Sequence, residues 1–150
     1  MARSPQAVLF VCGQNSVRSP TAAALLRHLV PRGLYVQSAG VSKATLDPFA
    51  VAVMKEIGLD ISAHKPWTIA DLEDWEGLNF DLIVSLSPEA HHKALQLTAT
   101  SATDVEYWPT PDPVGVEGRR EIQLDAYRHV RDSLQQRIRE RFAPAKAGNE

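Results

Sequence analysis

The sequence predicts an α/β domain of three layers, in which a four-stranded parallel sheet carries helices on both faces in a flavodoxin-like arrangement. Short apolar runs alternate along the chain with longer segments whose apolar residues recur at helical spacing. This alternation of strand and helix implies right-handed crossovers, which make neighbouring strands parallel. Because a chain of 150 residues has the length of one domain, we expect residues 1–150 to fold as a single unit.

Four short runs are the predicted strands, because each is apolar or rich in β-branched and aromatic residues. They span 8–11, 34–38, 80–85 and 105–108. The first run is continuously apolar, as expected of a strand that is buried on both faces. Since the carboxyl ends of parallel strands meet at one edge of a sheet, we expect the residues that follow the first and fourth strands to lie close together.

Most of the predicted helices begin at small polar residues that can cap a helix N-terminus. These predicted N-caps are Ser19, Asp47, Thr68 and Ser87. Proline follows three of them, and proline is favoured in the first helical turn because its missing N–H has no partner there. A long last helix is predicted from Ile122 to Phe142, with its arginines on a solvated face, and residues 143–150 are expected to form a flexible tail.

The net charge and the N-terminal residues limit the classes of partner. A formal charge of -2 provides no basic field, so we expect neither a nucleic-acid partner nor binding to anionic membranes. The apolar run at 7–12 is too short for the core of a signal peptide or for a membrane span. We therefore expect the protein to remain in the cytoplasm.

The cysteine and histidine content argues against a metal centre. A single cysteine excludes an internal disulfide and a cysteine-rich metal site. His91 and His92 are adjacent on a predicted helix, where neighbouring side chains point about 100° apart, and no third ligand completes a metal-binding spacing. Both are interpreted as solvated, and His64 is interpreted as a loop residue that makes local hydrogen bonds. No metal site and no cofactor are predicted.

The stretch from Val8 to Pro20 combines a nucleophile, a fixed cation and a helix start. A loop that leads from a strand into a helix directs backbone N–H groups and the positive end of the helix dipole at one spot, which favours an anion. Arg18 adds a planar guanidinium that can hold two oxygens of a tetrahedral oxyanion. Cys12 lies at the other end of the loop, where the same field favours a thiolate. We call residues 12–19 the anion loop and predict that a substrate oxyanion and an attacking sulfur share it.

The anion loop and three short motifs resemble the low-molecular-weight protein tyrosine phosphatases and the arsenate reductases that share their fold. This resemblance covers nearly the whole chain and is carried by 12–20, Ser38-Ala39-Gly40, Asp47-Pro48 and Asp112-Pro113. It implies that Cys12 is the nucleophile, Arg18 the oxyanion clamp and Asp112 the general acid, with the fold of that phosphatase family.

The same resemblance assigns the remaining residues of the anion loop. It implies that the Ser19 hydroxyl donates to the thiolate, and that Asn15 and Ser38 form a hydrogen-bonded pair that holds the loop in its strained shape. The residues expected to bind the substrate oxyanion are Gly13, Gln14, Asn15, Ser16, Val17, Arg18 and Ser19.

The function predicted from these residues is hydrolysis of a phosphate monoester through a phosphocysteine intermediate on Cys12, with Asp112 as general acid and base. The resemblance implies a protein tyrosine phosphatase acting on a phosphotyrosine protein or a small aryl phosphate. Phosphate, sulfate, vanadate and arsenate are expected to bind in the anion loop, and the protein is expected to be a monomer or a weak dimer. One alternative is an arsenate reductase that uses an external small thiol, and another is an oxyanion binder without turnover.

Two departures from the phosphatase pattern affect the expected chemistry. Many members of that family carry a second cysteine beside the nucleophile, where this chain has Val17, so a protective disulfide cannot form. Many members also have aromatic residues in the two loops that flank the cleft. The corresponding segments here, 42–46 and 114–115, contain none. The sequence therefore retains the machinery for phosphoryl transfer but lacks the expected contacts to a phenyl ring.

Overall fold

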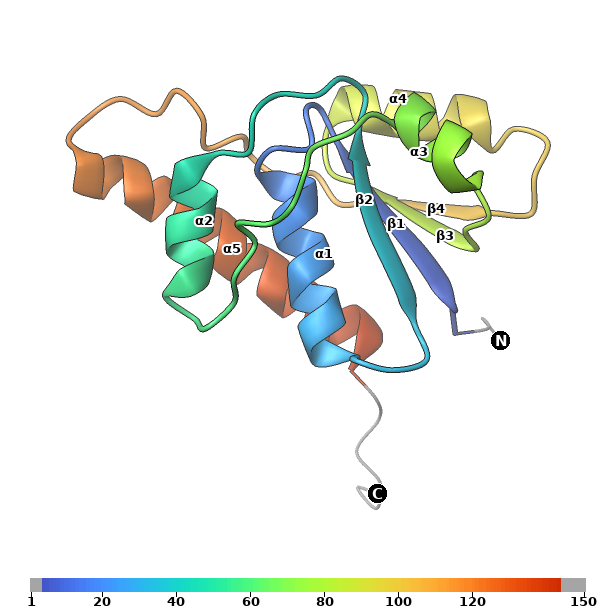
Figure 1. Ribbon diagram of the computed structural model, residues 1–150, viewed down its shortest axis with the longest axis horizontal. Helices are drawn as coiled ribbons and strands as arrows, with labels where there is room; N and C mark the ends of the chain where they lie inside the picture. The colour runs from blue at the N-terminus through green and yellow to red at the C-terminus, as the bar shows by residue number, and fades with distance from the viewer. Residues whose placement is uncertain (1–3, 144–150) are drawn as a thin grey trace, which may run out of the picture.

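The computed structural model describes residues 4–143, and within them four parallel strands form one sheet in the order β2-β1-β3-β4 (Figure 1). The strands are β1 Ala7–Cys12, β2 Tyr35–Gly40, β3 Leu82–Ser85 and β4 Asp104–Tyr107. Each of the two central strands, β1 and β3, has a neighbour on both sides. The chain adds β2 on one side of β1 and β3 on the other, so the strand order reverses at β1. The predicted flavodoxin-like fold is confirmed, and its ligand crevice is expected at this point of reversal.

Within the described residues, five helices cover the two faces of the sheet (Figure 1). One layer contains α1 Arg18–Leu29, α2 Pro48–Lys55 and α5 Arg120–Phe142, and the other contains α3 Ile69–Glu76 and α4 Pro88–Leu97. None of these five helices is long and apolar enough to span a bilayer. Of the predicted tail, 143–150, only Ala143 belongs to the described part of the chain, and the remainder lies outside it.

The strand β1 is continuously apolar because its side chains alternate between two hydrophobic cores. Val8 and Phe10 belong to the core under α1 and α5, whereas Leu9 and Val11 belong to the core under α3 and α4. All four are at most 1 % exposed. Burial of an aliphatic or aromatic side chain of this size contributes about 1.5–3 kcal/mol, so this strand is a rigid base for the loop that follows it.

Three of the four predicted N-caps are confirmed. The Asp47 carboxylate accepts a hydrogen bond from Phe49 N at 2.8 Å, and the Ser87 hydroxyl accepts one from Ala90 N at 3.2 Å. Thr68 forms a reciprocal capping box with Asp71. Each cap satisfies an N–H that has no partner within its helix, which defines where α2, α3 and α4 begin.

The prediction that Ser19 caps α1 is wrong. The helix begins two residues earlier than predicted, at Arg18, with Val17 at the N-cap position and no side-chain cap. Thr21 N donates to Val17 O at 3.1 Å, which is the first hydrogen bond of the helix. The Ser19 hydroxyl is thereby released from capping, and it points instead toward the sulfur of Cys12.

The arginines of α5 are not all on a solvated face, as the sequence had suggested. Arg131 is only 8 % exposed, and its guanidinium donates to Val53 O at 2.7 Å and to Glu56 at 2.9 Å. Arg128 also binds Glu56, at 2.8 Å. Hydrogen bonds from these two arginines lower the pKa of Glu56 to about 2. These contacts tie α5 to α2, which a sequence pattern read along one helix cannot reveal.

The interpretation of His91 as a solvated side chain is wrong. Its Nδ1 lies 2.9 Å from Ser85 Oγ, and its ring stacks on Tyr107 with 4.5 Å between centroids. Its neighbour His92 is exposed, as predicted. The two rings differ because they point to different sides of α4, and only one of those sides meets the sheet.

Candidate active site

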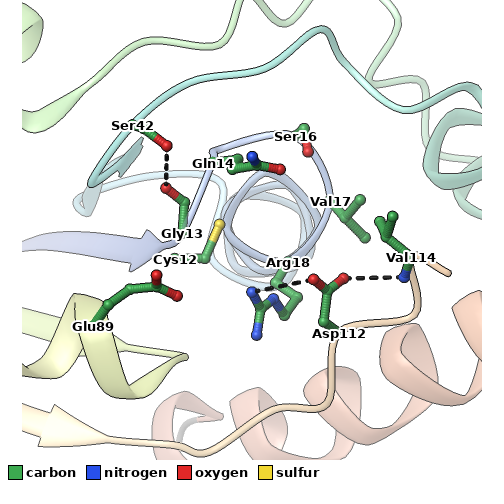
Figure 2. A pocket seen from close by; sticks show the side chains of 10 residues that line it. All are labelled: Cys12, Gly13, Gln14, Ser16, Val17, Arg18, Ser42, Glu89, Asp112 and Val114. Carbon is green, nitrogen blue, oxygen red and sulfur yellow. Dashed lines mark hydrogen bonds and ion pairs between the residues drawn. The ribbon is translucent and has the colours of Figure 1, made fainter.

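The anion loop forms one wall of a polar cavity of about 260 Å³ at the carboxyl edge of the sheet (Figure 2). The loop follows β1, the strand at which the strand order reverses. The cavity also receives side chains from the segment after β2, from the first turn of α4 and from the loop after β4. Its lining residues are Cys12, Gly13, Gln14, Ser16, Val17, Arg18, Ser42, Glu89, Asp112 and Val114.

The Cys12 sulfur lies at the base of this cavity and receives hydrogen bonds from the loop. Two backbone N–H groups point at Sγ, those of Asn15 at 3.3 Å and Ser19 at 3.4 Å. The Ser19 hydroxyl oxygen lies 3.0 Å from Sγ. The residue itself is only 2 % exposed. Two backbone N–H groups and one hydroxyl thus surround a single buried sulfur, the atom from which a cysteine acts as a nucleophile.

Asn15 holds the loop by using both ends of its side-chain amide. Its backbone adopts a left-handed conformation with φ of 54°, and the residue is completely buried. The Nδ2 group donates to Ser19 Oγ at 2.8 Å and to Ser38 Oγ at 2.9 Å. The Oδ1 atom accepts from Trp67 N at 3.1 Å and lies 3.0 Å from His64 Nε2. The predicted pairing of Asn15 with Ser38 is thus part of a larger buried network.

His64 and Trp67 connect this network to the segment between α2 and α3. Because Asn15 Oδ1 is an acceptor, His64 Nε2 carries the proton of their hydrogen bond. Burial lowers the pKa of His64, so the neutral ring is favoured in the folded protein. The prediction that His64 has a hydrogen-bonding role is confirmed, but its side-chain partner is not local, because Asn15 lies 49 residues away in the sequence. Trp67, whose Nε1 donates to Ser38 O at 2.6 Å, was not predicted, because nothing in its irregular segment indicates a partner so far away in sequence.

A second segment, 40–44, packs against the anion loop and is joined to it by backbone hydrogen bonds. Ser42 N donates to Gly13 O at 2.9 Å, and Ala44 N donates to Gln14 O at 3.1 Å. Such an approach requires Gly40, since a Cβ there would lie 2.2 Å from Ser42 O and 2.8 Å from Asn15 N. The Ser38-Ala39-Gly40 motif therefore combines a hydroxyl partner for the loop with the one residue type that fits beside it.

Arg18 of the anion loop meets Asp112 from the loop after β4, as expected of segments that follow the first and fourth strands. Arg18 Nη1 donates to Thr110 O at 2.9 Å, which orients the guanidinium toward the cavity, and Nη2 lies 3.9 Å from Asp112 Oδ2. Asp112 Oδ1 accepts from Val114 N at 3.0 Å. The Arg18 side chain is 11 % exposed and that of Asp112 is 54 % exposed. A fixed cation and an accessible carboxyl group thus face the same space as the sulfur (Figure 2).

Glu89 lines the cavity although the sequence indicated it only as an early residue of a helix. It lies in the first turn of α4, and its carboxylate extends over the anion loop on the side away from Asp112 (Figure 2). A Cβ built on Gly13 would be 3.1 Å from Glu89 Oε1 and 3.7 Å from Arg18 Nη2. The cavity therefore has a carboxylate on each side, and we call Asp112 and Glu89 the rim carboxylates.

The remaining lining residues agree with the departures noted in the sequence. Val17, where many phosphatases of the resembled family have a second cysteine, lines the cavity next to Arg18. Ser42 and Val114 occupy the two loops where aromatic residues would flank the cleft, and none of the residues that line the described cavity is aromatic. A bound phosphate would be held at its oxygens, while its organic group would meet polar side chains and carboxylates.

Comparison with known proteins relates the whole chain to one family. Residues 7–148 match the family model described as low molecular weight phosphotyrosine protein phosphatase. The chain is 36 % identical over 134 residues to an arsenate reductase from Halalkalibacterium halodurans, covering 88 % of this chain and 91 % of that protein.

Solved structures with the same fold carry other activities. The YwlE arginine phosphatase from Geobacillus stearothermophilus has a TM-score of 0.74 and 27 % identity, with 93 % of this chain and 91 % of that chain covered. The tyrosine phosphatase Wzb from Escherichia coli in complex with sulphate has the same TM-score at 22 % identity, with 91 % and 96 % covered, and shows the shared fold. Related chains thus bear the names of three activities.

Proposed function

The chain belongs to the low-molecular-weight phosphotyrosine protein phosphatase family, and from that premise we propose that it hydrolyses phosphate monoesters through a covalent intermediate on Cys12. The observation that carries this proposal is the convergence of two backbone N–H groups and one hydroxyl on the buried sulfur of Cys12. An oxyanion-binding protein without turnover would need neither that sulfur nor the carboxyl group of Asp112.

In the first step, the Cys12 thiolate attacks phosphorus in line with the leaving group. The S–P bond forms and the P–O bond to the leaving group breaks, with its electron pair remaining on oxygen. Asp112 donates a proton to that oxygen. The Arg18 guanidinium and the backbone N–H groups of 13, 14 and 16–18 hold the three non-reacting oxygens, where negative charge is spread in the transition state.

In the second step, water releases phosphate from Cys12. Asp112, now a carboxylate, accepts a proton from the attacking water, so that the residue that acted as acid acts next as base. The S–P bond breaks, its electron pair returns to sulfur, and inorganic phosphate leaves. The two steps together consume one water and regenerate the thiolate and the protonated Asp112.

The substrate class that the family description supports is phosphotyrosine on a protein or peptide. Asp112 is on an exposed loop and its side chain is 54 % exposed, which suits access by a residue displayed on a large partner. We therefore propose protein phosphotyrosine as a substrate, with small aryl phosphates as test compounds and with phosphate, sulfate, vanadate and arsenate as ligands of the anion loop.

Arsenate reduction is the second candidate, favoured by the arsenate reductase that is 36 % identical to this chain. Arsenate has the tetrahedral shape of phosphate and suits the same loop. After Cys12 has bound arsenic through sulfur, a second thiol must attack that sulfur, so that an S–S bond forms and the S–As bond breaks with its electron pair on arsenic, which leaves as arsenite. A further thiol must then reduce the mixed disulfide and free Cys12. Cys12 is the single cysteine of the chain, so this candidate requires an external thiol such as glutathione.

Steady-state assays separate the two candidates. The wild type and the Cys12→Ser and Asp112→Asn variants are assayed with p-nitrophenyl phosphate, with a phosphotyrosine peptide, and with arsenate plus glutathione. We expect phosphate release that vanadate inhibits and that both substitutions reduce. Arsenite formation that depends on Cys12, without any phosphate release, would replace the phosphatase proposal by the reductase one.

A further inference from the structure

We propose that Glu89 makes this site selective for phosphorylated substrates that carry a positive charge close to the phosphate. The inference rests on the proposed hydrolysis at Cys12 and narrows its substrate class. It starts from the placement of Glu89, whose carboxylate extends over Gly13 on the side of the cavity opposite Asp112 (Figure 2).

The residues that line the cavity carry more negative than positive charge, which disfavours a substrate whose charged group is a phosphate alone. Arg18 is the only cationic side chain among the residues that line the described cavity, and it already lies 3.9 Å from Asp112. Glu89 forms no ion pair within 4.0 Å with any residue in the described range 4–143. Its carboxylate thus adds a negative charge to the rim of a site that must bind an anion and hold a thiolate. We expect this repulsion to weaken phosphate binding severalfold at low salt.

A positive group on the substrate would convert this repulsion into attraction. A guanidinium or ammonium beside the phosphate can pair with Glu89 while the phosphate pairs with Arg18. The absence of aromatic lining within the described cavity agrees with this, because nothing there favours a bare phenyl ring. Gln14 and Ser42 leave the remaining wall polar. The cavity is thus built for a substrate in which opposite charges lie side by side.

Two substrates supply this chemistry. In a phosphotyrosine peptide, lysine or arginine residues beside the tyrosine would reach Glu89. In an N-phosphorylated arginine, the cation is part of the leaving group. There the S–P bond forms as the P–N bond breaks, the electron pair remains on nitrogen, and the proton from Asp112 yields a free guanidinium. Both depend on Glu89 for the same reason.

A structural role for Glu89 makes a different prediction. Negative residues in the first turn of a helix stabilise it through the helix dipole. The capping of α4 itself is done by Ser87, whose hydroxyl accepts from Ala90 N. A residue that only stabilises α4 would change the melting temperature without changing the preference between two substrates.

The test compares Glu89→Gln with Glu73→Gln, which removes an exposed carboxylate of α3 that does not line the cavity. kcat/KM is measured at low salt for two phosphotyrosine peptides that differ only in having lysine or glutamate beside the tyrosine, and for an N-phosphoarginine peptide. We expect the wild type to favour the cationic substrates over the glutamate peptide by about tenfold or more. Glu89→Gln should reduce that ratio severalfold, and Glu73→Gln should leave it unchanged.

Equal ratios in the wild type and Glu89→Gln would overturn the inference while leaving the proposed hydrolysis intact. If no peptide is hydrolysed, the proposed function fails, and calorimetric binding of inorganic phosphate then decides the role of Glu89. Tighter phosphate binding by Glu89→Gln, and not by Glu73→Gln, would support the inference. Unchanged binding would overturn it. The ranking of N-phosphoarginine against the lysine peptide tells which source of positive charge the site favours.

Discussion

The base of the cavity and its rim differ in burial and in hydrogen bonding. At the base, Cys12, Asn15, Ser19 and Ser38 are each at most 2 % exposed and are joined by hydrogen bonds between 2.8 and 3.4 Å. At the rim, Asp112 and Glu89 are exposed, and Asp112 is held by one backbone hydrogen bond and a long contact to Arg18. The base is therefore a rigid buried network, and the rim is a set of accessible charges.

Base and rim differ in how much change each tolerates and in what each contributes to the reaction. A buried polar network tolerates little change, because any partner that is lost leaves another buried group unsatisfied. An exposed carboxylate can be exchanged at small structural cost, yet its charge acts directly on an approaching substrate. Nucleophilic attack and oxyanion binding should accordingly depend on the base, whereas proton transfer by Asp112 and the choice of substrate depend on the rim. Substitutions at Cys12, Asp112, Asn15 and His64 test this division and are expected to have effects that decrease in that order.

The largest loss of activity is expected from Cys12→Ser, which replaces the nucleophile and leaves Arg18 and the loop N–H groups in place. Turnover of p-nitrophenyl phosphate should fall about 1,000-fold or more. Vanadate binding, measured by calorimetry, should persist within severalfold of the wild type. Turnover close to that of the wild type would show that the sulfur is not the nucleophile.

Asp112→Asn should reduce kcat roughly 10²- to 10⁴-fold, since the amide can neither donate a proton to the leaving group nor accept one from water. The loss should be greater for phenyl phosphate than for p-nitrophenyl phosphate, because the poorer leaving group needs the proton more. The melting temperature should change little, as the side chain is exposed. An equal loss for both substrates would argue against proton donation by this residue.

Asn15→Ala should damage both stability and activity. It leaves Ser38, Ser19 and Trp67 N without their partner and places alanine at a φ of 54°, so we expect a loss of about 3 kcal/mol in the free energy of unfolding. Urea denaturation measures this loss. Ser16→Ala is the matched control, because Ser16 also lines the cavity. Similar losses in both variants would mean that the network around Asn15 has no special role.

The smallest effect concerns His64 and pH. Because burial lowers the pKa of His64 in the folded protein, the stability linked to the neutral ring is complete above the ordinary pKa of 6.5 and is lost as pH falls below it. Melting temperatures of the wild type and His64→Gln are compared between pH 8 and pH 5. The wild type should lose more stability over this interval than the variant, whose amide does not titrate. Equal changes in melting temperature with pH for the two proteins would contradict the lowered pKa of His64.

The features that could be predicted from the sequence are those that depend on residues close together in the chain. The apolar run of β1, the caps at Asp47, Thr68 and Ser87, and the spacing of Cys12 and Arg18 each result from interactions within a few residues. The alternation of strands and helices then led to the parallel sheet, and the sheet placed Asp112 at the same edge as Cys12. These inferences succeed because connection rules leave few topologies open.

The contacts between distant segments that complete the site are visible in the tertiary structure alone. Whether Ser19 caps α1 or faces the Cys12 sulfur depends on where the helix begins, which the packing of the loop sets. The contacts of Trp67 with Asn15 and Ser38, and the placement of Glu89 over Gly13, join residues that share no local pattern. Such contacts depend on the relative positions of whole elements, and those positions result from packing the entire core.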